Sequence, residues 1–249
     1  MRIIRKGISI LSILLVVLSL FALIRFKNEW MQNSREFAIQ SIEVSGIDLI
    51  NSNYIMELSG LTPGQNIWSV DLQKAKTDLD ANPFIERVTL QRKLPNILEV
   101  RVEEKKPIAS LNFQGELFCI DKDGLILPSK PGKLYNMPVI SGDFEGGVRV
   151  GSRASGPMVM KGLEFLKLII EDRPEIYDQI SQVVPGDARG LTVYTSKRGI
   201  AVVIGSGREI QKIRYLEAAL AEIEKDPDIG RIRYIDLRYR GQVVIGMRA

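Results

Sequence analysis

Residues 84–103 read FIERVTLQ-RKLPN-ILEVRVE, and this stretch decides the fold of the first part of the chain. Phe84–Gln91 and Ile97–Glu103 are two strand-like stretches. Arg92–Asn96, which separates them, has the length of a hairpin connection and contains Pro and Asn, two residues favoured in turns. We therefore predict a β-hairpin over these residues.

The residues before this hairpin predict one more strand and two helices. Apolar and polar residues alternate over Ile39–Ser45, which is the period of a strand. A short helix over Asn51–Leu58 is capped by one of its first two residues. Asp71 caps a second helix, which ends before Pro83 because the residue preceding a proline is pushed out of the α region. The order β-α-α-β-β would place two helices on one face of a three-stranded sheet.

The residues after Pro107 predict a larger domain that is rich in strands and carries two helices. Residues 128–154 are rich in Pro, Gly and Ser and are predicted to be mostly loop. The α+β class therefore describes the whole chain. The predicted elements are strands at Ile108–Phe113, Leu117–Ile120 and Leu125–Leu127, a helix at Met158–Glu171, strands at Ser181–Val184, Leu191–Tyr194 and Ile200–Ile204, a helix at Arg208–Lys225, and a hairpin of Ile232–Tyr239 and Gln242–Met247.

An apolar stretch near the N-terminus predicts a membrane anchor. Ile8–Ile24 reads ISILSILLVVLSLFALI, seventeen residues without a charge or a proline. A helix of that length covers roughly 26 Å, near the lower limit for spanning a bilayer, and Phe26 and Trp30 can extend it into the interface. Basic residues precede it and place the N-terminus in the cytoplasm, with the following domains outside.

A cleaved signal peptide is the rival interpretation of this stretch. Its hydrophobic region would have about 7–15 residues and would end in an A-x-A-like site. Here the stretch is longer and ends in Ala22-Leu23-Ile24-Arg25-Phe26. A buried soluble helix is disfavoured as well, because seventeen apolar residues leave no polar face. The sequence therefore favours an uncleaved anchor.

The basicity of the chain belongs to this N-terminal tail. The formal net charge is +4 and the pI is about 9.1. Without Arg2, Arg5 and Lys6, 31 basic residues face 30 acidic ones. A nearly neutral remainder has no global attraction to a phosphate backbone, so nucleic acid is not an expected partner.

The residue types argue against an enzyme. The chain has no histidine and one cysteine, Cys119. The absence of histidine removes the commonest general base, the usual zinc ligand and every Ser-His or Cys-His nucleophile system. A single cysteine cannot form an internal disulfide. We expect no catalytic residue, no cofactor and no metal site.

Two glycine-containing motifs have a structural interpretation. Gly205-Ser206-Gly207 lies between a strand and a helix, as in a dinucleotide fingerprint, but Ile210 occupies the third glycine position, so a strand-to-helix turn is favoured. Asp121-Lys122-Asp123-Gly124 lacks the further ligands of a calcium loop, because apolar residues follow it. Asp and Gly supply the backbone geometry of a β-turn, which we predict there.

Several short motifs follow the basic tail and the anchor in a fixed order. They are Ile42–Gly46, Asn82–Val88, Arg92–Pro95, Leu98–Val100, Glu103–Pro107, Ile120–Gly124 and Tyr234–Tyr239. In this order they resemble the FtsQ/DivIB family of bacterial septum-formation proteins. The first looks like the opening of that family's POTRA domain, and the last looks like its penultimate strand. Each motif is weak alone, and their order carries the resemblance.

The resemblance implies a non-enzymatic division protein of the inner membrane, found at the septum. Members bridge early and late division proteins and bind the small coiled-coil proteins FtsB/DivIC and FtsL. The resemblance further implies a cytoplasmic tail at 1–7, a transmembrane helix at 8–26, a juxtamembrane linker at 27–38, a POTRA-like domain at 39–105 and a β domain at 106–249. In that family the terminal hairpin engages the coiled-coil partner, and the matched positions are Arg238, Tyr239, Val244, Ile245 and Met247.

The last predicted strand is a candidate binding site on sequence grounds that do not depend on the resemblance. Gln242–Met247 is terminal and contains neither proline nor charge, whereas natural edge strands usually carry blocking features. An unblocked edge can accept a strand from a partner. The alternative is that these residues form the buried core of the hairpin. Ile42–Gly46 is a second candidate surface, in the first domain.

Two other functions compete with division. A POTRA-bearing membrane protein that handles secreted polypeptides is the main alternative, although the sequence shows no repeat of POTRA units. An anchored cell-wall hydrolase is disfavoured by the missing histidine and by the lack of a convergent pair of carboxylates, although glycosidases can work with carboxylates alone.

Overall fold

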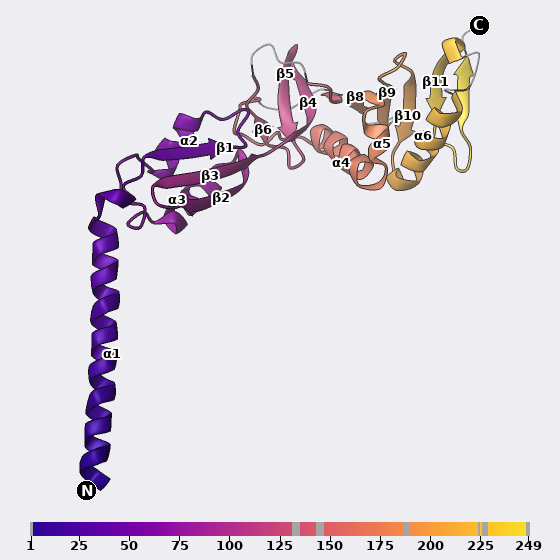
Figure 1. Ribbon diagram of the computed structural model, residues 1–249. Coiled ribbons are helices and arrows are strands. Elements are labelled where there is room, and N and C mark those ends of the chain that lie inside the picture. Colours follow the sequence, from indigo (N-terminus) through magenta and orange to yellow (C-terminus); the bar gives the residue numbers. More distant parts are fainter. Residues whose placement is uncertain are drawn as a thin grey trace. The chain divides into compact units, whose positions relative to one another are not determined.

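The chain folds into two compact units, Met1–Glu104 and Lys105–Ala249 (Figure 1). The computed structural model describes residues 2–130, 135–142, 147–186, 190–223, 225 and 229–247, with side chains from residue 13 onward. The predicted cytoplasmic tail at 1–7 and the start of the predicted anchor at 8–12 therefore lie outside the described side chains.

The first unit contains the predicted β-α-α-β-β order. Its sheet has the strand order β1-β3-β2, in which β1 and β3 run parallel and β2 and β3 form the predicted antiparallel hairpin. The two helices and the sheet enclose one apolar core. The elements are α1 (Arg2–Asn33), η1 (Arg35–Phe37), β1 (Ser41–Ser45), α2 (Ser52–Ser59), α3 (Leu72–Asp80), β2 (Ile85–Lys93) and β3 (Ile97–Glu104).

Local hydrogen bonds set the ends of these elements. Asn51 caps α2 by accepting from the amide of Asn53, and Asp71 caps α3, as predicted. β1 begins two residues later than predicted, because the amides of Ile39 and Gln40 donate to loop carbonyls outside the ladder. Gly46 ends the strand with φ +81°, and a Cβ there would lie 2.1 Å from the carbonyl oxygen of Val102. Only glycine fits this approach.

The N-terminal helix α1 continues past the predicted anchor at 8–26, into the stretch predicted to be a juxtamembrane helix or linker. Residues 27–33 of the expected linker at 27–38 continue the helix to Asn33, because no glycine or proline interrupts it there. Its described apolar side chains, from Ile13 to Phe26, are each at least half exposed. Within the part of the chain whose side chains are described, no helix carries an apolar stretch long enough to cross a bilayer.

The second unit is built on a single nine-stranded sheet with the order β12-β11-β10-β9-β8-β7-β4-β5-β6. The sheet mixes antiparallel pairs with the parallel pairs β4–β7, β7–β8 and β10–β11. The elements are β4 (Pro107–Phe113), β5 (Glu116–Asp121), β6 (Ile126–Leu127), β7 (Val139–Ser141), α4 (Pro157–Asp172), α5 (Pro174–Tyr177), β8 (Ile180–Pro185), β9 (Leu191–Thr195), β10 (Ala201–Gly205), α6 (Glu209–Ile223), η2 (Ile229–Arg231), β11 (Ile232–Asp236) and β12 (Val244–Met247).

The predicted strands and the two long helices of this unit are present, and three details differ. The stretch at 128–154 is not all loop, because β7 lies within it and joins β4 to β8. The short helix α5 was not predicted from the sequence. The terminal hairpin is shorter than expected: β11 ends at Asp236 instead of Tyr239, and β12 begins at Val244 instead of Gln242. The carboxylate of Asp236 ends β11 by accepting from the amide of Arg238.

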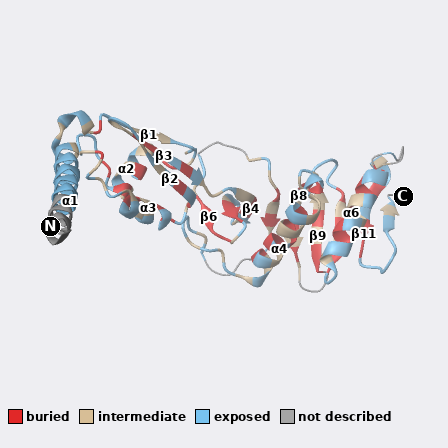
Figure 2. Cartoon of the chain, turned by 60° about the horizontal axis from the view of Figure 1, so that its bottom comes forward, coloured by how far each residue is buried: buried red, intermediate tan, exposed pale blue. Residues whose placement is uncertain are grey.

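The helices α4 and α6 pack on the same face of this sheet and enclose its core with it (Figure 1). A Cβ on Gly162 of α4 would lie 3.1 Å from the side chain of Ile140 in β7, so helix and sheet are in close contact. Figure 2 shows buried segments, in red, in the strands β8, β9 and β11 and on the helices beside them. In the strands, buried residues alternate with partly exposed ones, as expected for a sheet covered on one side.

We predict that Tyr177 stabilises the second unit through its partly buried hydroxyl. This hydroxyl donates to the carbonyl of Ile108, 2.8 Å away, and ties α5 to β4. Burial, together with the nearby Asp178, raises the pKa of Tyr177 to about 12. Tyr177→Phe should lower the free energy of unfolding by about 1 kcal/mol in urea denaturation at pH 7.

The sign of the pH effect follows from the raised pKa. The folded state holds the phenolic proton more tightly than the unfolded state, so this stabilisation is complete below about pH 10 and is lost as the pH rises toward about 12. The difference between the native chain and Tyr177→Phe should shrink over that range. Exposed Tyr239→Phe is the control, and equal midpoints for both variants would contradict the assignment.

Candidate partner-binding edge

The two edges of the nine-stranded sheet are treated differently by the rest of the chain. At one edge, β6 is covered: the amide of Ile126 donates to the carbonyl of Ser152, and the amide of Gly151 donates to the carbonyl of Ile126, both at 2.9 Å. At the other edge, β12 pairs with β11, and no described strand pairs with its outer side. β12 is therefore an edge strand of the sheet among the described residues, as predicted from the sequence.

A row of apolar residues crosses the sheet on the face covered by the helices and ends at β12. Residues paired across neighbouring strands place their side chains on the same face. In this row every interior member has a relative exposure of 0%, whereas Ile245, the last, is 42% exposed. This core row is therefore buried as far as β11, and its last member, on β12, is exposed. Its members, in register, are Leu111, Ile140, Val183, Val193, Val202, Ile235 and Ile245.

Both faces of β12 are exposed. Ile245 and Met247 lie on the helix-bearing side and Val244 on the other, because alternate residues of a strand point to opposite faces. Their exposures are 42%, 47% and 37%. The alternative that these residues form buried core is therefore wrong. An apolar edge strand with exposed side chains on both faces resembles the surface on which another strand is added.

Tyr234 and Gly246 are two residues of this edge that the sequence did not single out as a pair. They face each other across β11 and β12, and a Cβ on Gly246 would lie 2.2 Å from a ring carbon of Tyr234. The ring therefore lies over the glycine and shields the backbone of the edge strand on that side. Only the register, with its bulge between Ile232 and Tyr234, could have revealed the contact.

The side chain of Arg238 forms an ion pair within the chain. Its guanidinium donates to both carboxylate oxygens of Asp236, with distances of 2.6–3.1 Å. Asp236 is only 4% exposed, and the hydrogen bonds from Arg238 hold the pKa of its carboxyl below the usual range, although burial opposes this. The same carboxylate raises the pKa of Arg238. Arg238 therefore has a structural role, because its ion pair with Asp236 fixes the end of β11. Its side chain is nevertheless 46% exposed.

The turn from β10 into α6 lies next to this ion pair. Gly205 has φ +74°, and a Cβ there would lie 2.8 Å from Cγ of Arg238 and 3.4 Å from Nζ of Lys212. Lys212 is 4% exposed and donates to the carbonyl of Ser206, and burial lowers the pKa of its amine. The sequence motif at 205–207 is therefore the strand-to-helix turn that we predicted.

The hairpin carries an excess of positive charge. Among the described residues 229–247 there are four arginines and one carboxylate, that of Asp236, which Arg238 already neutralises. Tyr239 lies in the turn and is 53% exposed. The cations nearest the edge strand therefore favour an acidic or neutral ligand. The four arginines are Arg231, Arg233, Arg238 and Arg240.

The other motifs of the sequence serve the fold. One oxygen of Asp121 accepts from the amides of Asp123 and Leu125, which makes the predicted turn at 121–124. Across the described residues, no group of three or more acidic, cysteine or histidine side chains is placed to hold a metal ion. In the first unit, the candidate stretch Ile42–Gly46 overlaps β1, which is an edge of its sheet, and Ile42 and Val44 pack against the core.

Comparison with known protein families matches both units. The family model described as "POTRA domain, FtsQ-type" matches residues 37–105, and the model described as "Cell division protein FtsQ/DivIB, C-terminal" matches residues 109–238. The second match begins within β4, includes β5 to β11 and ends at Arg238, so Tyr239 and β12 lie beyond it. The α+β architecture of a POTRA domain followed by a β-rich domain is confirmed.

Curated relatives cover most of the chain. The cell division protein FtsQ of Geotalea daltonii is 29% identical over 215 residues, which are 84% of this chain and 75% of the relative. FtsQ of Syntrophotalea carbinolica is 27% identical over 90% of this chain and 79% of the relative. The cell division protein DivIB of Clostridium acetobutylicum is 29% identical over 85% of this chain and 84% of the relative.

We predict that Arg238→Met lowers the urea midpoint of the second unit at pH 7, because it leaves the buried carboxylate of Asp236 without its partner. The pKa of Asp236 is depressed in the folded state, so the ion pair stabilises the fold above about pH 4 and this contribution is lost as the pH falls below that value. The difference in urea midpoint between the native chain and the variant should therefore narrow as the pH falls below about 4. Exposed Arg240→Met, in the same hairpin, is the matched control; an equal loss in both variants would refute this role.

Proposed function

The chain belongs to the FtsQ/DivIB family of cell division proteins, and on this premise we propose that it is a non-enzymatic membrane scaffold of the division machinery. Its task is to recruit and link septal division proteins outside the cytoplasm. The binding event is the addition of a partner strand to β12. The observation that carries the proposal is the open, apolar edge of the nine-stranded sheet.

Strand addition would give the edge strand β12 a hydrogen-bonding neighbour on its outer side. An added strand satisfies the outward backbone groups of β12, and alternate side chains of that strand would cover Val244 on one face and Ile245 and Met247 on the other. An apolar partner residue beside Ile245 would extend the core row by one member. Burial of such a side chain contributes about 1.5–3 kcal/mol.

The proposed partners are the small coiled-coil division proteins of the FtsB/DivIC and FtsL type. Charge complementarity with the arginines of the hairpin favours a partner segment that carries carboxylates. Exposed Tyr239 offers a stacking or hydrogen-bonding surface where the strand begins. Arg238 contributes the exposed part of its side chain while it stays paired to Asp236.

We further propose that α1 anchors the protein in the inner membrane as a single-pass segment over residues 8–26, with the N-terminus in the cytoplasm. The support is the sequence run at 8–24 together with the exposed apolar side chains described from Ile13 onward. Apolar side chains that are exposed along a helix, as these are from Ile13 to Phe26, are stable in an apolar solvent. An anchor would confine binding to the membrane surface, where partners with their own anchors lie.

The alternative, a POTRA-bearing membrane protein that handles secreted polypeptides, is less well supported. A POTRA domain alone would fit either function. The match of residues 109–238 to the division-specific C-terminal model favours division. Septal enrichment of a fluorescent fusion supports the scaffold, whereas a uniform envelope signal supports the alternative.

We predict that Ile245→Lys weakens capture of the FtsB/DivIC-type partner by at least about tenfold, because it places a charge where an apolar partner side chain would be buried. Leu117→Lys is the matched control, since Leu117 is also an exposed apolar strand residue of this sheet, on β5. Binding is measured by titration of the purified chain in detergent with the extracytoplasmic segment of the partner.

A parallel substitution separates strand addition from docking on one face. Val244→Lys changes the opposite face of the same strand, so both variants should weaken binding if a strand is added. Loss in only one of them would indicate docking on a single face. Native affinity in both Ile245→Lys and Val244→Lys would contradict the site altogether.

For the anchor, we predict that the pair Val17→Arg and Leu20→Arg removes the chain from the membrane fraction. An arginine at the centre of a spanning helix costs about 2.5–3.5 kcal/mol on the insertion scale. Resistance to alkaline carbonate extraction is the measurement, and Gln32→Arg near the end of α1 is the control. Unchanged resistance in the double variant would refute the anchor.

A further inference from the structure

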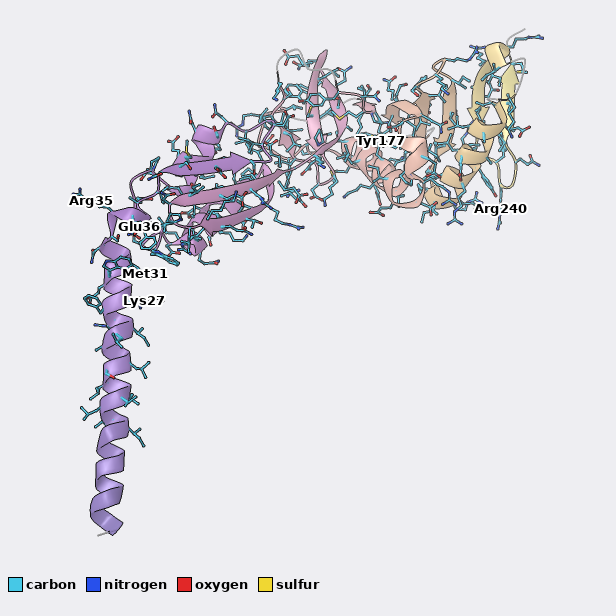
Figure 3. The ribbon with its side chains drawn as sticks, in the orientation of Figure 1. Lys27, Met31, Arg35, Glu36, Tyr177 and Arg240 are labelled. Carbon is cyan, nitrogen blue, oxygen red and sulfur yellow. The ribbon has the colours of Figure 1, made fainter. Side chains whose placement is uncertain are left out.

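The end of α1 is held by a side chain of the first domain. The last carbonyls of a helix have no partner within the helix. Here the side-chain amide of Asn66 donates to the carbonyls of Met31, at 2.9 Å, and Ser34, at 3.2 Å. Its own oxygen accepts from the amide of Trp68, which fixes the orientation of the Asn66 side chain. Figure 3 labels Met31 near the end of α1 and Arg35 in η1, which follows it.

A row of aromatic rings connects the same two parts. Trp30 of α1 meets Phe37 edge to face, with ring centroids 5.9 Å apart. Phe37 meets Trp68 at 6.1 Å, and the guanidinium of Arg92 lies over the Trp68 ring at 5.7 Å. Such contacts stabilise a defined geometry, because each ring has a preferred approach.

Hydrogen bonds to backbone carbonyls connect this row of rings to the sheet. Arg92, on β2, donates to the carbonyls of Ile67 at 2.7 Å and Val70 at 2.8 Å. The amide of Ile67 donates to the carbonyl of Phe37, and Ile67 itself is fully buried. Hydrogen bonds and ring contacts therefore lead without a break from the last turn of α1 to β2. A flexible linker would have none of these contacts.

We propose that these contacts form a rigid joint, so that α1 and the first domain move as one body. Asn66 is the positioning residue of the joint. The joint rests on the proposed function in one respect, namely that α1 is the membrane anchor. Given that anchor, rotation or tilt of α1 in the bilayer sets how the first domain is presented to other membrane proteins. A protein that packs against the anchor would thereby bias contacts of the domain, without touching it.

The test is a distance distribution in the full chain, reconstituted in lipid nanodiscs. Spin labels at Lys27→Cys on α1 and Thr89→Cys on β2, in a Cys119→Ser background, report the geometry by pulsed electron paramagnetic resonance. Both labelled positions are exposed. We expect a narrow distribution in this background and a distribution at least about twice as wide once Asn66→Ala and Trp68→Ala are added.

Asn33→Ala is the matched control, because the Asn33 amide donates within α1, to the carbonyl of Glu29, and does not reach the domain. Insertion of three Gly/Ser residues between Asn33 and Ser34 gives a second variant that leaves the domain sequence intact, in case the substitutions unfold it. A broad distribution in the unsubstituted background, or an equally narrow one in the insertion variant, would overturn the joint.

The joint and the proposed function can fail separately. Binding of the coiled-coil partner to the terminal hairpin should be unchanged in the insertion variant, since β12 belongs to the other unit. If the native chain does not bind the partner, the scaffold function is refuted. The spin-label distances would still test the joint in that case. In cells, the insertion variant should support septation less well than the native chain at equal abundance, and full support would contradict the joint.

Discussion

An open β-sheet has two edges, and the second unit depends on how each of them is handled. Its nine strands form one sheet that does not close on itself, so two rows of backbone hydrogen-bonding groups need a partner or solvent. The chain covers the β6 edge with its own segment around Gly151 and Ser152. On the outer side of β12, no strand of the described residues is paired. An apolar edge strand of this kind is a liability for a free protein and a docking site for a protein that works in a complex.

The same contrast is visible in the packing of side chains. The helices α4 and α6 bury the core row completely as far as Ile235, and the row then ends at the exposed Ile245. On the opposite face, the ring of Tyr234 lies over Gly246. The Asp236–Arg238 ion pair ends β11 and thereby sets where the turn to β12 begins. These contacts hold β12 in place while its outer side remains available.

Patterns that act over a few residues were predictable from the sequence. The hairpin at 84–103, the cap at Asp71 and the amphipathic helix α6 each depend on neighbours along the chain. β7 was not predictable because it has only three residues and pairs with β4 and β8, which lie far from it along the chain. The exposure of Ile245, the Tyr234–Gly246 contact and the joint at Asn66 also depend on register or tertiary packing, which periodicity does not contain.

Amide hydrogen exchange is the most direct test of whether β12 accepts a partner strand. The full chain in detergent is compared with and without the extracytoplasmic segment of the FtsB/DivIC-type partner. We expect slower exchange of the amides at 243–247 in the complex, with exchange at the β6 edge unchanged. Bound partner that slows exchange elsewhere, and leaves the amides of β12 as fast as in the free chain, would contradict strand addition.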